Sequence, residues 1–299
     1  MIYTQIRAFD AVAREGSFMR AAEMLGVTQP ALTIQVKALE ETYGVKLLHR
    51  SGRSIRLTEA GERLFKMSRR FASVEEEIRH ELSASEELKN VHLRLAVDGP
   101  HIAMGLFARF VARHPGVSLS VATGNTRFVK QELLERRTDV AILPGIRRHP
   151  QVHAVPLWHH VAVLIVARNH PWAGRKSVDL KELDGQPMIA REDGSNTQKT
   201  VDEILTKAGV EPKVVLQLGS REGVCEAVAE GLGTAIIWQL EAYGLNRIVA
   251  VPIRGNVIRS TDYVACLKSE RLRRSVKAFF AIADSLPGNK VDIEALRAA

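Results

Sequence analysis

The sequence predicts two parts of different fold class: an N-terminal α+β winged helix-turn-helix with a long linker helix, and a C-terminal α/β domain of two lobes. Two short helical patterns on either side of Gly26 indicate the first part. A narrow apolar stripe with steps of three and four residues predicts the linker helix. Two successive series of alternating strands and helices predict the two lobes. The expected boundaries are 1–58 for the winged module, 59–88 for the linker and 89–299 for the two-lobed domain, with lobe I at about 89–162 and 267–299 and lobe II at about 163–266.

The composition is that of a soluble globular protein, with 45% hydrophobic and 25% charged residues among 299. No stretch approaches about 18 consecutive apolar residues, so we expect no membrane span. The first 18 residues carry charges of both signs in a helical pattern, which is unlike a signal peptide and predicts a cytoplasmic protein. Cys225 and Cys266 are the only cysteines, and we expect reduced, buried thiols.

Positive charge is concentrated in one segment of a chain whose formal net charge is +8. Residues 46–70 hold eight basic residues against two glutamates, and residues 71–90 hold six glutamates. A basic segment beside a helical motif indicates nucleic-acid binding, whereas a basic run alone is more often a solvated face.

The helix-turn-helix pattern rests on caps and on one glycine. Ser17 is placed to cap a helix over residues 18–25, and Gly26 permits the sharp turn that follows. Thr28 then caps a third helix, and Pro30 falls in its first turn, where the missing N–H costs nothing.

The third helix has an inward and an outward face. The inward stripe consists of Leu32, Val36, Leu39 and Tyr43. The outward residues are Gln29, Pro30, Thr33, Ile34 and Lys37. If the N-terminal end of this helix enters a major groove, Gln29 can pair with adenine, Thr33 and Ile34 can meet base edges or a thymine methyl, and Lys37 can meet phosphate. An ordinary helical hairpin with a polar outer face is the alternative for the motif in isolation.

The segment after the third helix favours DNA binding. VKLLHRSGRSIRLT predicts two short strands around Ser51 and Gly52, a β-wing. We expect Arg50, Arg53 and Arg56 to project from the wing onto the phosphate backbone, which makes affinity depend strongly on salt.

A long helix is predicted from Thr58 to about Ser85. Its apolar stripe comprises Ala60, Leu64, Met67, Phe71, Val74, Ile78 and Leu82. This stripe is close to a heptad seam on a helix of roughly 40 Å, and such a helix needs a partner. The simplest partner is a second copy of the same chain, which also suits DNA sites with two-fold symmetry.

The segment GSFMRAAEMLGVTQPALTIQVKALEETYGVKLLHRSGRSIRLTEAGERL resembles the LysR-type transcriptional regulators in its fixed positions. The match is specific because it spans helix, turn, wing and the start of the linker together, and it covers residues 1 to about 86. The resemblance implies that Gln29, Pro30, Thr33 and Lys37 read DNA and that Arg50 and Arg53 face its backbone.

The rest of the chain alternates strands and helices and predicts a largely parallel α/β sheet. The first series is VHLRLAV, PHIAMGLFARFVARHP, VSLSVAT, NTRFVKQELLERR and DVAIL, and the second is PMIARE, NTQKTVDEILTKA, KVVLQL, SREGVCEAVAEG and GTAIIW. We expect the chain to cross between the lobes at Val161–Arg168 and at Thr261–Lys268. In this region LysR-type regulators resemble type 2 periplasmic binding proteins, so the resemblance covers nearly the whole chain.

Three strand-to-helix turns, TGNT, GSNT and GSRE, place small or hydroxylic residues at helix starts. Free N–H groups and the helix dipole make such ends suited to anions, although each turn alone could be an N-cap and nothing more. Arg191 and Arg221 lie next to two of the turns and could hold carboxylate, phosphate or phosphonate oxygens. Arg221 could equally pair with Glu222 or Glu226.

A fourth turn, DGPH, places a carboxylate at Asp98 where the family often has Ser or Thr. If Asp98 faces the cleft between the lobes, it favours a cationic group on an otherwise anionic ligand. The stretches REDGSNTQKTVDEIL and SREGVCEAVAEGLG further resemble regulators associated with aminoethylphosphonate catabolism, so 2-aminoethylphosphonate is a candidate effector. The candidate effector-binding residues are Asp98, Gly99, Pro100, His101, Thr123, Asn125, Thr126, Arg191, Ser195, Asn196, Thr197, Ser220, Arg221 and Glu222.

No sequence pattern supports an enzyme. Ser195 lies in GSN rather than in G-x-S-x-G, and neither a Walker A sequence nor a Rossmann glycine fingerprint is present. We interpret the histidines at 149, 153, 159 and 160 as structural or solvent-facing rather than metal ligands, so we expect no catalytic residue, no metal and no cofactor. The remaining alternative is a small-molecule-binding α/β protein or enzyme whose N-terminal module has only an architectural role on DNA.

The expected partners are double-stranded DNA, a small anionic or zwitterionic effector, and further copies of the chain in a homodimer or homotetramer. RNA polymerase is a further candidate partner, and no membrane is expected. Ligand in the cleft would close the lobes and shift an equilibrium between arrangements of the oligomer, which changes how the DNA-binding pairs are spaced.

Overall fold

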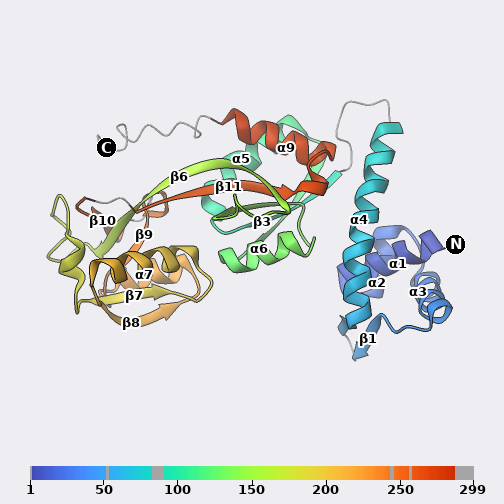
Figure 1. Ribbon diagram of the computed structural model, residues 1–299, viewed down its shortest axis with the longest axis horizontal. Helices are drawn as coiled ribbons and strands as arrows, with labels where there is room; N and C mark the ends of the chain where they lie inside the picture. The colour runs from blue at the N-terminus through green and yellow to red at the C-terminus, as the bar shows by residue number, and fades with distance from the viewer. Residues whose placement is uncertain (1, 52–53, 83–90, 243–245, 256–257, 287–299) are drawn as a thin grey trace. The chain divides into compact units, whose positions relative to one another are not determined.

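The computed structural model describes residues 2–51, 54–82, 91–242, 246–255 and 258–286. The chain divides into two compact units, one of residues 1–86 with 135–137 and one of residues 87–134 with 138–299. The helices and strands of both units are labelled in Figure 1.

The N-terminal unit begins with three helices, α1 (Ile2–Glu15), α2 (Phe18–Leu25) and α3 (Gln29–Tyr43). The predicted caps are confirmed, because the Ser17 and Thr28 hydroxyls accept hydrogen bonds from the N–H groups of Arg20 and Ala31. Gly26 ends α2 with a left-handed φ of 65°, which explains the glycine between the two helices.

The core of this unit forms where α1, α2 and α3 meet the first turns of the long helix. Its most buried members are Phe9, Val12, Ala21, Leu32, Val36 and Leu39. Tyr43 was predicted to join this stripe, and that prediction is wrong because its side chain is 56% exposed. Tyr43 is the last residue of α3, and the chain turns away at Gly44 before the core can cover it.

The predicted wing is confirmed as an antiparallel pair, β1 (Leu48–Ser51) and β2 (Ser54–Leu57). It is followed by α4 (Glu59–Leu82), capped by the Thr58 hydroxyl, which accepts from the N–H of Gly61 at 3.0 Å. A Cβ on Gly61 would lie 2.1 Å from the carbonyl oxygen of Leu47, so only glycine lets α4 pack against the start of the wing. The expected end of this helix near Ser85 lies outside the described residues.

A buried polar contact fastens α4 to α1. The carboxylate of Asp10 accepts a hydrogen bond from the Ser68 hydroxyl at 2.7 Å and lies 3.7 Å from Nη1 of Arg69. On the outward side of α4 the expected seam is exposed at Met67, Phe71, Val74 and Ile78. The first residues of the seam, Ala60 and Leu64, pack against the core instead, and Tyr3 of α1 contacts the Phe71 ring. From Met67 onward the helix presents largely exposed apolar side chains to solvent.

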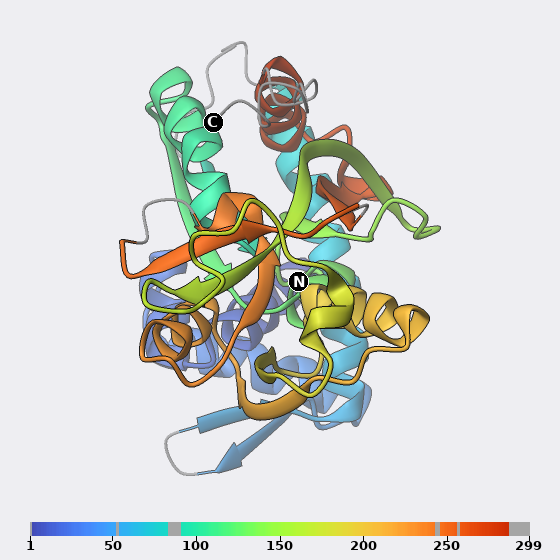
Figure 2. The same cartoon turned by 90° about the vertical axis from the view of Figure 1, so that its left-hand side faces the viewer.

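The C-terminal unit contains two lobes joined by two long strands. Lobe I holds β3 (Val91–Val97), α5 (Pro100–Arg113), β4 (Val117–Thr123), α6 (Thr126–Leu134), β5 (Val140–Pro144) and α9 (Arg274–Ser285). Lobe II holds β7 (Pro187–Arg191), α7 (Asn196–Ala208), β8 (Lys213–Leu218), α8 (Arg221–Ala229), β9 (Ala235–Trp238) and β10 (Ile248–Pro252), with short helical turns η1 (Leu180–Leu183) and η2 (Gln239–Ala242). A third turn, η3 (Lys268–Glu270), precedes α9. The strands β6 (Val152–Ala167) and β11 (Arg259–Leu267) run side by side between the lobes (Figure 1, Figure 2).

The sheet is mixed, so the prediction of a largely parallel sheet is wrong. β3 pairs in parallel with β4 and β5, and β7 with β8, but β6 pairs antiparallel with β9, β10 and β11. The two crossings were placed on the right segments, although β6 begins nine residues earlier than Val161. That early part has the sequence VHAVPLWHH, in which the proline and the histidines break the apolar alternation typical of a strand.

Each lobe is a sheet with helices on both faces, as expected for α/β layers. In lobe I, α5 and α9 cover the face that carries Leu93 and Leu95, and α6 covers the face that carries Ala96 (Figure 1). In lobe II, α7 packs on Leu164 of β6 and α8 packs on its neighbour Ile165. The loops at the carboxyl ends of the parallel strands lead into the N-terminal ends of the helices.

Candidate nucleic-acid interface and ligand cleft

The outward face of α3 is open to solvent. Gln29 and Pro30 are exposed, and Ile34 is 65% exposed although it is apolar. The hydroxyl of half-buried Thr33 donates to the carbonyl oxygen of Gln29 at 2.9 Å, and Lys37 forms an exposed ion pair with Glu41 at 3.3 Å. The five candidate DNA-contacting residues of this helix therefore share its outward, N-terminal surface.

The wing places its basic residues on two strands. Arg50 lies on β1 opposite Ile55, and Arg56 lies on β2 with its side chain exposed. Arg53 is outside the described residues.

Glu40 is a positioning residue that the sequence did not reveal. Its buried carboxylate accepts hydrogen bonds from the N–H groups of Leu47 and Leu48, at 2.7 and 3.3 Å. Because Glu40 belongs to α3 and Leu48 begins the wing, this contact fixes the wing against the outward helix.

In the C-terminal unit, three of the candidate residues serve as helix caps. The side chains of Asn125, Ser195 and Ser220 accept hydrogen bonds from the N–H groups three residues later. The simple capping role is therefore present at α6, α7 and α8, which leaves fewer side-chain groups for a ligand. The helix α5 starts without a side-chain cap, at Gly99 and Pro100, as does α9 at Arg273. Thr123 and Glu222 are exposed, and Thr197 is buried within α7.

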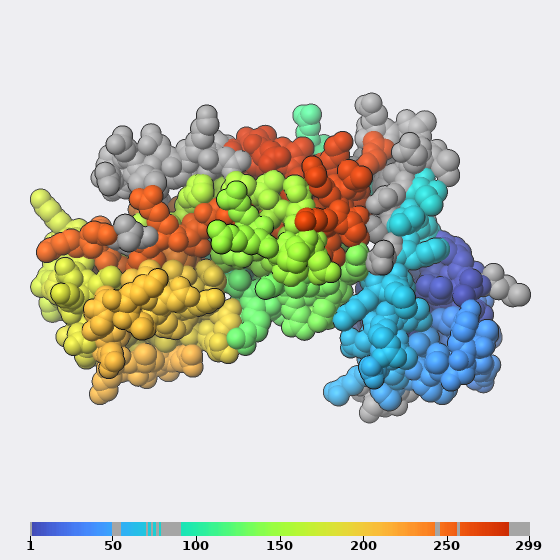
Figure 3. Space-filling view, viewed as in Figure 1, coloured from blue at the N-terminus to red at the C-terminus, as the bar shows by residue number. Residues whose placement is uncertain are grey.

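The two lobes touch through α6 and the loop before α7. Thr126 donates its hydroxyl proton to Asp98 and accepts from the N–H of Asn196 at 3.2 Å. Next to it, the N–H of Arg127 donates to the carbonyl oxygen of Gly194 at 3.2 Å, and its guanidinium pairs with Asp193 at 3.0 Å. In Figure 3 the green atoms of lobe I adjoin the yellow atoms of lobe II on the visible face.

Asp98 also belongs to a group of ionisable side chains whose charges affect one another. They are Asp98, His101, His160, Arg191, Arg221, Glu241 and Asp262, from six different elements and the loop before α5. Burial raises the pKa of Asp98 to about 7, because burial and the charges of Asp262 and Glu241 outweigh the opposing hydrogen bond from Thr126 and the charge of Arg191. Burial likewise raises the pKa of Glu241.

The two histidines of this cluster differ in charge. Burial, together with the charge of Arg221, lowers the pKa of His101 to about 4, so this imidazole is neutral. Burial lowers the pKa of His160, but the hydrogen bond to Asp262 at 2.7 Å and the negative charges of Asp262, Glu241 and Asp98 together outweigh burial and raise this pKa. His160 is 3% exposed, in accord with a structural role, whereas His159 is exposed and hydrogen-bonds Thr261 at 2.9 Å.

Both candidate arginines have partners inside lobe II. Arg191 contacts Glu192 at 2.9 and 3.2 Å. Arg221 donates to the backbone carbonyl of Glu241 and lies 3.6 Å from Glu222, while Glu226 pairs with Arg247 instead.

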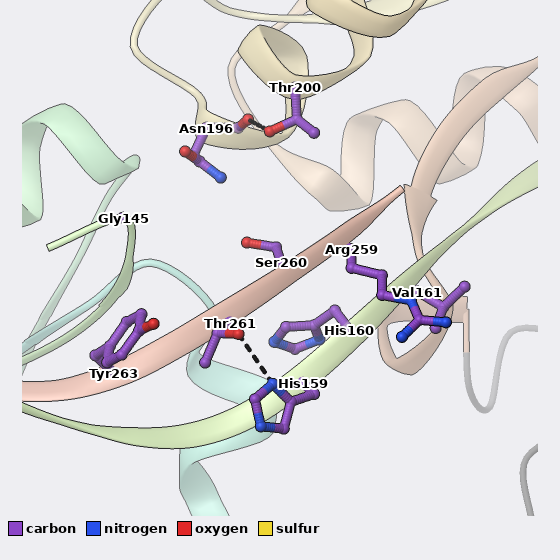
Figure 4. A pocket seen from close by; sticks show the side chains of 10 residues that line it. All are labelled: Gly145, His159, His160, Val161, Asn196, Thr200, Arg259, Ser260, Thr261 and Tyr263. Atoms are coloured by element: carbon purple, nitrogen blue, oxygen red, sulfur yellow. Dashed lines mark hydrogen bonds between the residues drawn. The ribbon is translucent and has the colours of Figure 1, made fainter. Parts of the chain in front are cut away.

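A cavity of about 550 Å³ lies between the lobes against the crossing strands (Figure 4). Its polar lining residues include His160, Asn196, Thr200, Ser260 and Tyr263, with Asn196 and Thr200 on the α7 side and the others on β6 and β11. Of the candidate effector-binding residues, Asn196 lines it. A second, more polar hollow of about 630 Å³ borders Thr126, Ser195 and Asn196.

The cleft residues on the crossing strands were not found from the sequence. His160 and Asp262 are 102 positions apart and meet through strand register, which no local pattern encodes. Glu241 follows a buried strand without any motif.

Comparison with known proteins identifies the family. The model of bacterial regulatory helix-turn-helix proteins of the lysR family matches residues 3–62, and the model of the LysR substrate binding domain matches residues 87–286. The HTH-type transcriptional activator CmpR of Synechocystis sp. is 31% identical over 280 residues, which covers 92% of each protein.

Solved structures agree with the fold. A full-length OxyR variant from Pseudomonas aeruginosa matches with a TM-score of 0.81 at 23% identity, over 96% of each chain. The CcmR regulatory domain of Synechocystis in complex with 2-PG matches with a TM-score of 0.60 at 25% identity, over 64% of this chain and 95% of that one. Among the described residues, no helix is long and apolar enough to cross a membrane. The chain belongs to the LysR family: it is a DNA-binding transcriptional regulator with a small-molecule effector domain, and not an enzyme.

Proposed function

We propose that a small anionic or zwitterionic effector, bound between the two lobes, controls how this regulator binds its operator DNA. The observation that carries the proposal is a set of three buried nitrogen atoms: Nε2 of His101, Nδ1 of His160 and Nε of Arg221 have no hydrogen-bond partner among the described residues. Leaving a buried polar group unpaired costs about 1–3 kcal/mol, so a ligand that pairs with these atoms binds with that gain.

Two of these nitrogens, Nε of Arg221 and Nδ1 of His160, favour an oxyanion. Nε of Arg221 is a permanent N–H donor, and His160 donates from Nδ1 when it carries a proton, a form that Asp262 stabilises. Carboxylate, phosphate and phosphonate oxygens match such donors. The 2-PG bound to the CcmR regulatory domain is a ligand of a protein with the same domain fold.

The carboxylates of Asp98 and Glu241 favour a second, cationic group on the effector. Both lie within electrostatic range of Arg191, yet burial keeps both pKa values raised, so their negative charge is poorly compensated. A zwitterion such as 2-aminoethylphosphonate would place an ammonium group there and its phosphonate near Arg221.

In the N-terminal unit, the residues that we propose to read DNA bases are Gln29, Pro30, Thr33, Ile34 and Lys37. Arg50 and Arg53 are proposed to contact the phosphate backbone of the DNA. The support is that the α3 residues share one outward surface and that the wing lies beside it.

We further propose the domain limits 1–58, 59–88 and 89–299. We also propose a homodimer or homotetramer that forms through the α4 seam, a location in the cytoplasm, and contact with RNA polymerase.

Calorimetric titration of the full-length protein tests the ligand proposal. Binding of 2-aminoethylphosphonate tighter than that of a plain dicarboxylate is the expected result, and no heat from the phosphonate would end that candidate. Arg221→Gln should weaken binding of whichever anion binds by about tenfold or more, because it removes a buried charged donor. Arg109→Gln, an exposed site on α5, is the control. Equal affinities for the two variants would contradict the placement of the site.

A further inference from the structure

Asp98 stands at one end of a short chain of hydrogen bonds that joins the lobes. Its carboxylate accepts from the Thr126 hydroxyl, whose oxygen accepts from the N–H of Asn196 at the start of α7. Asp98 and Thr126 belong to lobe I, whereas Asn196 belongs to lobe II. The Arg127–Asp193 pair and the Arg127–Gly194 backbone bond lie beside this chain. The described structure is therefore a closed arrangement of the two lobes.

The charges around Asp98 do not compensate it. Asp262 faces it from β11 and Glu241 from η2, and both are negative when ionised. Arg191 faces it from β7, but its guanidinium is held by Glu192. His160 of β6 is also within electrostatic range, and its Nε2 is held by Asp262. No ion pair of Asp98 is found in the part of the chain that the structure describes.

We propose that closing the cleft takes up a proton at Asp98, so that pH alone shifts the domain between open and closed arrangements. The inference rests on the proposed function only in treating this cleft as the effector site.

The direction follows from linkage between protonation and closure. Opening would hydrate Asp98 and move it away from both Glu241 and Arg191 of lobe II. Hydration and the loss of Glu241 lower the pKa of Asp98 toward the ordinary value of 3.8, and they outweigh the loss of Arg191 because burial is the largest cause and Arg191 the smallest. The closed arrangement then holds the proton more tightly, with a pKa of about 7 for Asp98. Acid therefore favours closure, and the advantage is lost progressively as the pH rises from the open-state value to about 7.

The distance between the lobes is a direct readout. Arg109 on α5 and Lys207 on α7 are exposed, and cysteines there can carry spin labels, while the natural Cys225 and Cys266 are buried. The labelled full-length chain is mixed with an excess of unlabelled chain, so that pulsed electron paramagnetic resonance reports only distances between the two labels of one chain. No ligand or DNA is added.

In the otherwise unchanged labelled chain, the ratio of closed to open arrangements should fall about tenfold between about pH 5.5 and pH 7.5 and change little above that range. Asp98→Asn should stay closed throughout, because the amide oxygen still accepts from Thr126 and carries no charge. Asp193→Asn is the matched control: it weakens an exposed inter-lobe pair but keeps Asp98, so the pH response should remain.

Two results would overturn the proposal. One is a distance distribution that does not change with pH. The other is a response that survives in Asp98→Asn and disappears in His160→Asn, which would assign the proton to the His160–Asp262 pair. Neither result would affect DNA binding or effector binding by the full-length protein, so failure here is distinguishable from failure of the proposed function.

Discussion

At the scale of single residues, the ligand cleft is defined by buried groups whose charges are incompletely balanced. Asp98 was singled out from the sequence because a carboxylate stands at a turn that opens a helix. Its environment could not be foreseen, since Glu241 and Asp262 reach it from segments more than 140 positions away in the chain. Chain topology, rather than local pattern, brings these carboxylates together.

Asp98→Asn should change stability in a pH-dependent way. The pKa of Asp98 is about 7 in the folded protein and 3.8 as the ordinary value, so ionisation destabilises the fold and the loss is complete above about pH 7. The variant should gain about 1–3 kcal/mol at pH 8, with the gain shrinking toward pH 5. Thermal unfolding of the full-length chain at several pH values measures this, and a gain that grows toward acid would contradict it.

On the DNA side, Gln29→Ala and Arg56→Ala should have different effects. Loss of a base contact at Gln29 should cost about 1–3 kcal/mol on the operator and relax base preference there, while random DNA is bound as before. Loss of Arg56 should weaken all sequences alike and reduce the slope of log affinity against log salt by about 1. Titrations of operator and random duplexes at three salt concentrations separate the two, and identical behaviour of the variants would refute the division.

At the scale of helices and strands, local chemistry predicted the N-terminal unit well. The caps at Ser17 and Thr28, the glycine turn and the wing depend on residues close together in sequence, and the structure confirms each of them. The crossing strand β6 was found only in its apolar half. The first half of β6 pairs with β11, which lies about 100 residues later in the chain, and the register of this pair shifts between Asp262 and Tyr263.

The seam of α4 carries the dimerisation prediction. Ile78 is 55% exposed on the apolar stripe, so Ile78→Glu should place a charge in the interface between two copies and raise the dimer dissociation constant by about tenfold or more. Lys66→Glu, exposed on the same helix but outside the stripe, changes the charge by more and should have little effect. Sedimentation over a range of concentrations reports both. Equal dimer dissociation constants for Ile78→Glu and the unaltered protein would show that the α4 seam is not the dimer interface.

At the scale of the whole molecule, the regular alternation of strands and helices was enough to predict two lobes and their crossings. The mixed order of the sheet was not predictable, because β6 and β11 cross between the lobes in opposite directions and their antiparallel pairing with β5, β9 and β10 leaves no periodic pattern in the sequence. The candidate effector-binding residues were placed at strand ends by a general rule for α/β sheets. The structure brings Asp98 within electrostatic range of Arg191 and His101 within range of Arg221, and Glu241 interacts with both arginines. Thr123 and Glu222 remain exposed.

The central claim is that α3 and the wing read a specific duplex. Fluorescence anisotropy can compare the full-length protein on DNA from the region upstream of its own gene with a scrambled duplex of equal length and composition. The expected result at about 0.1 M salt is binding to the upstream duplex about 10³-fold tighter or more. Equal affinity for both duplexes, or no binding to either at low ionic strength, would contradict the account.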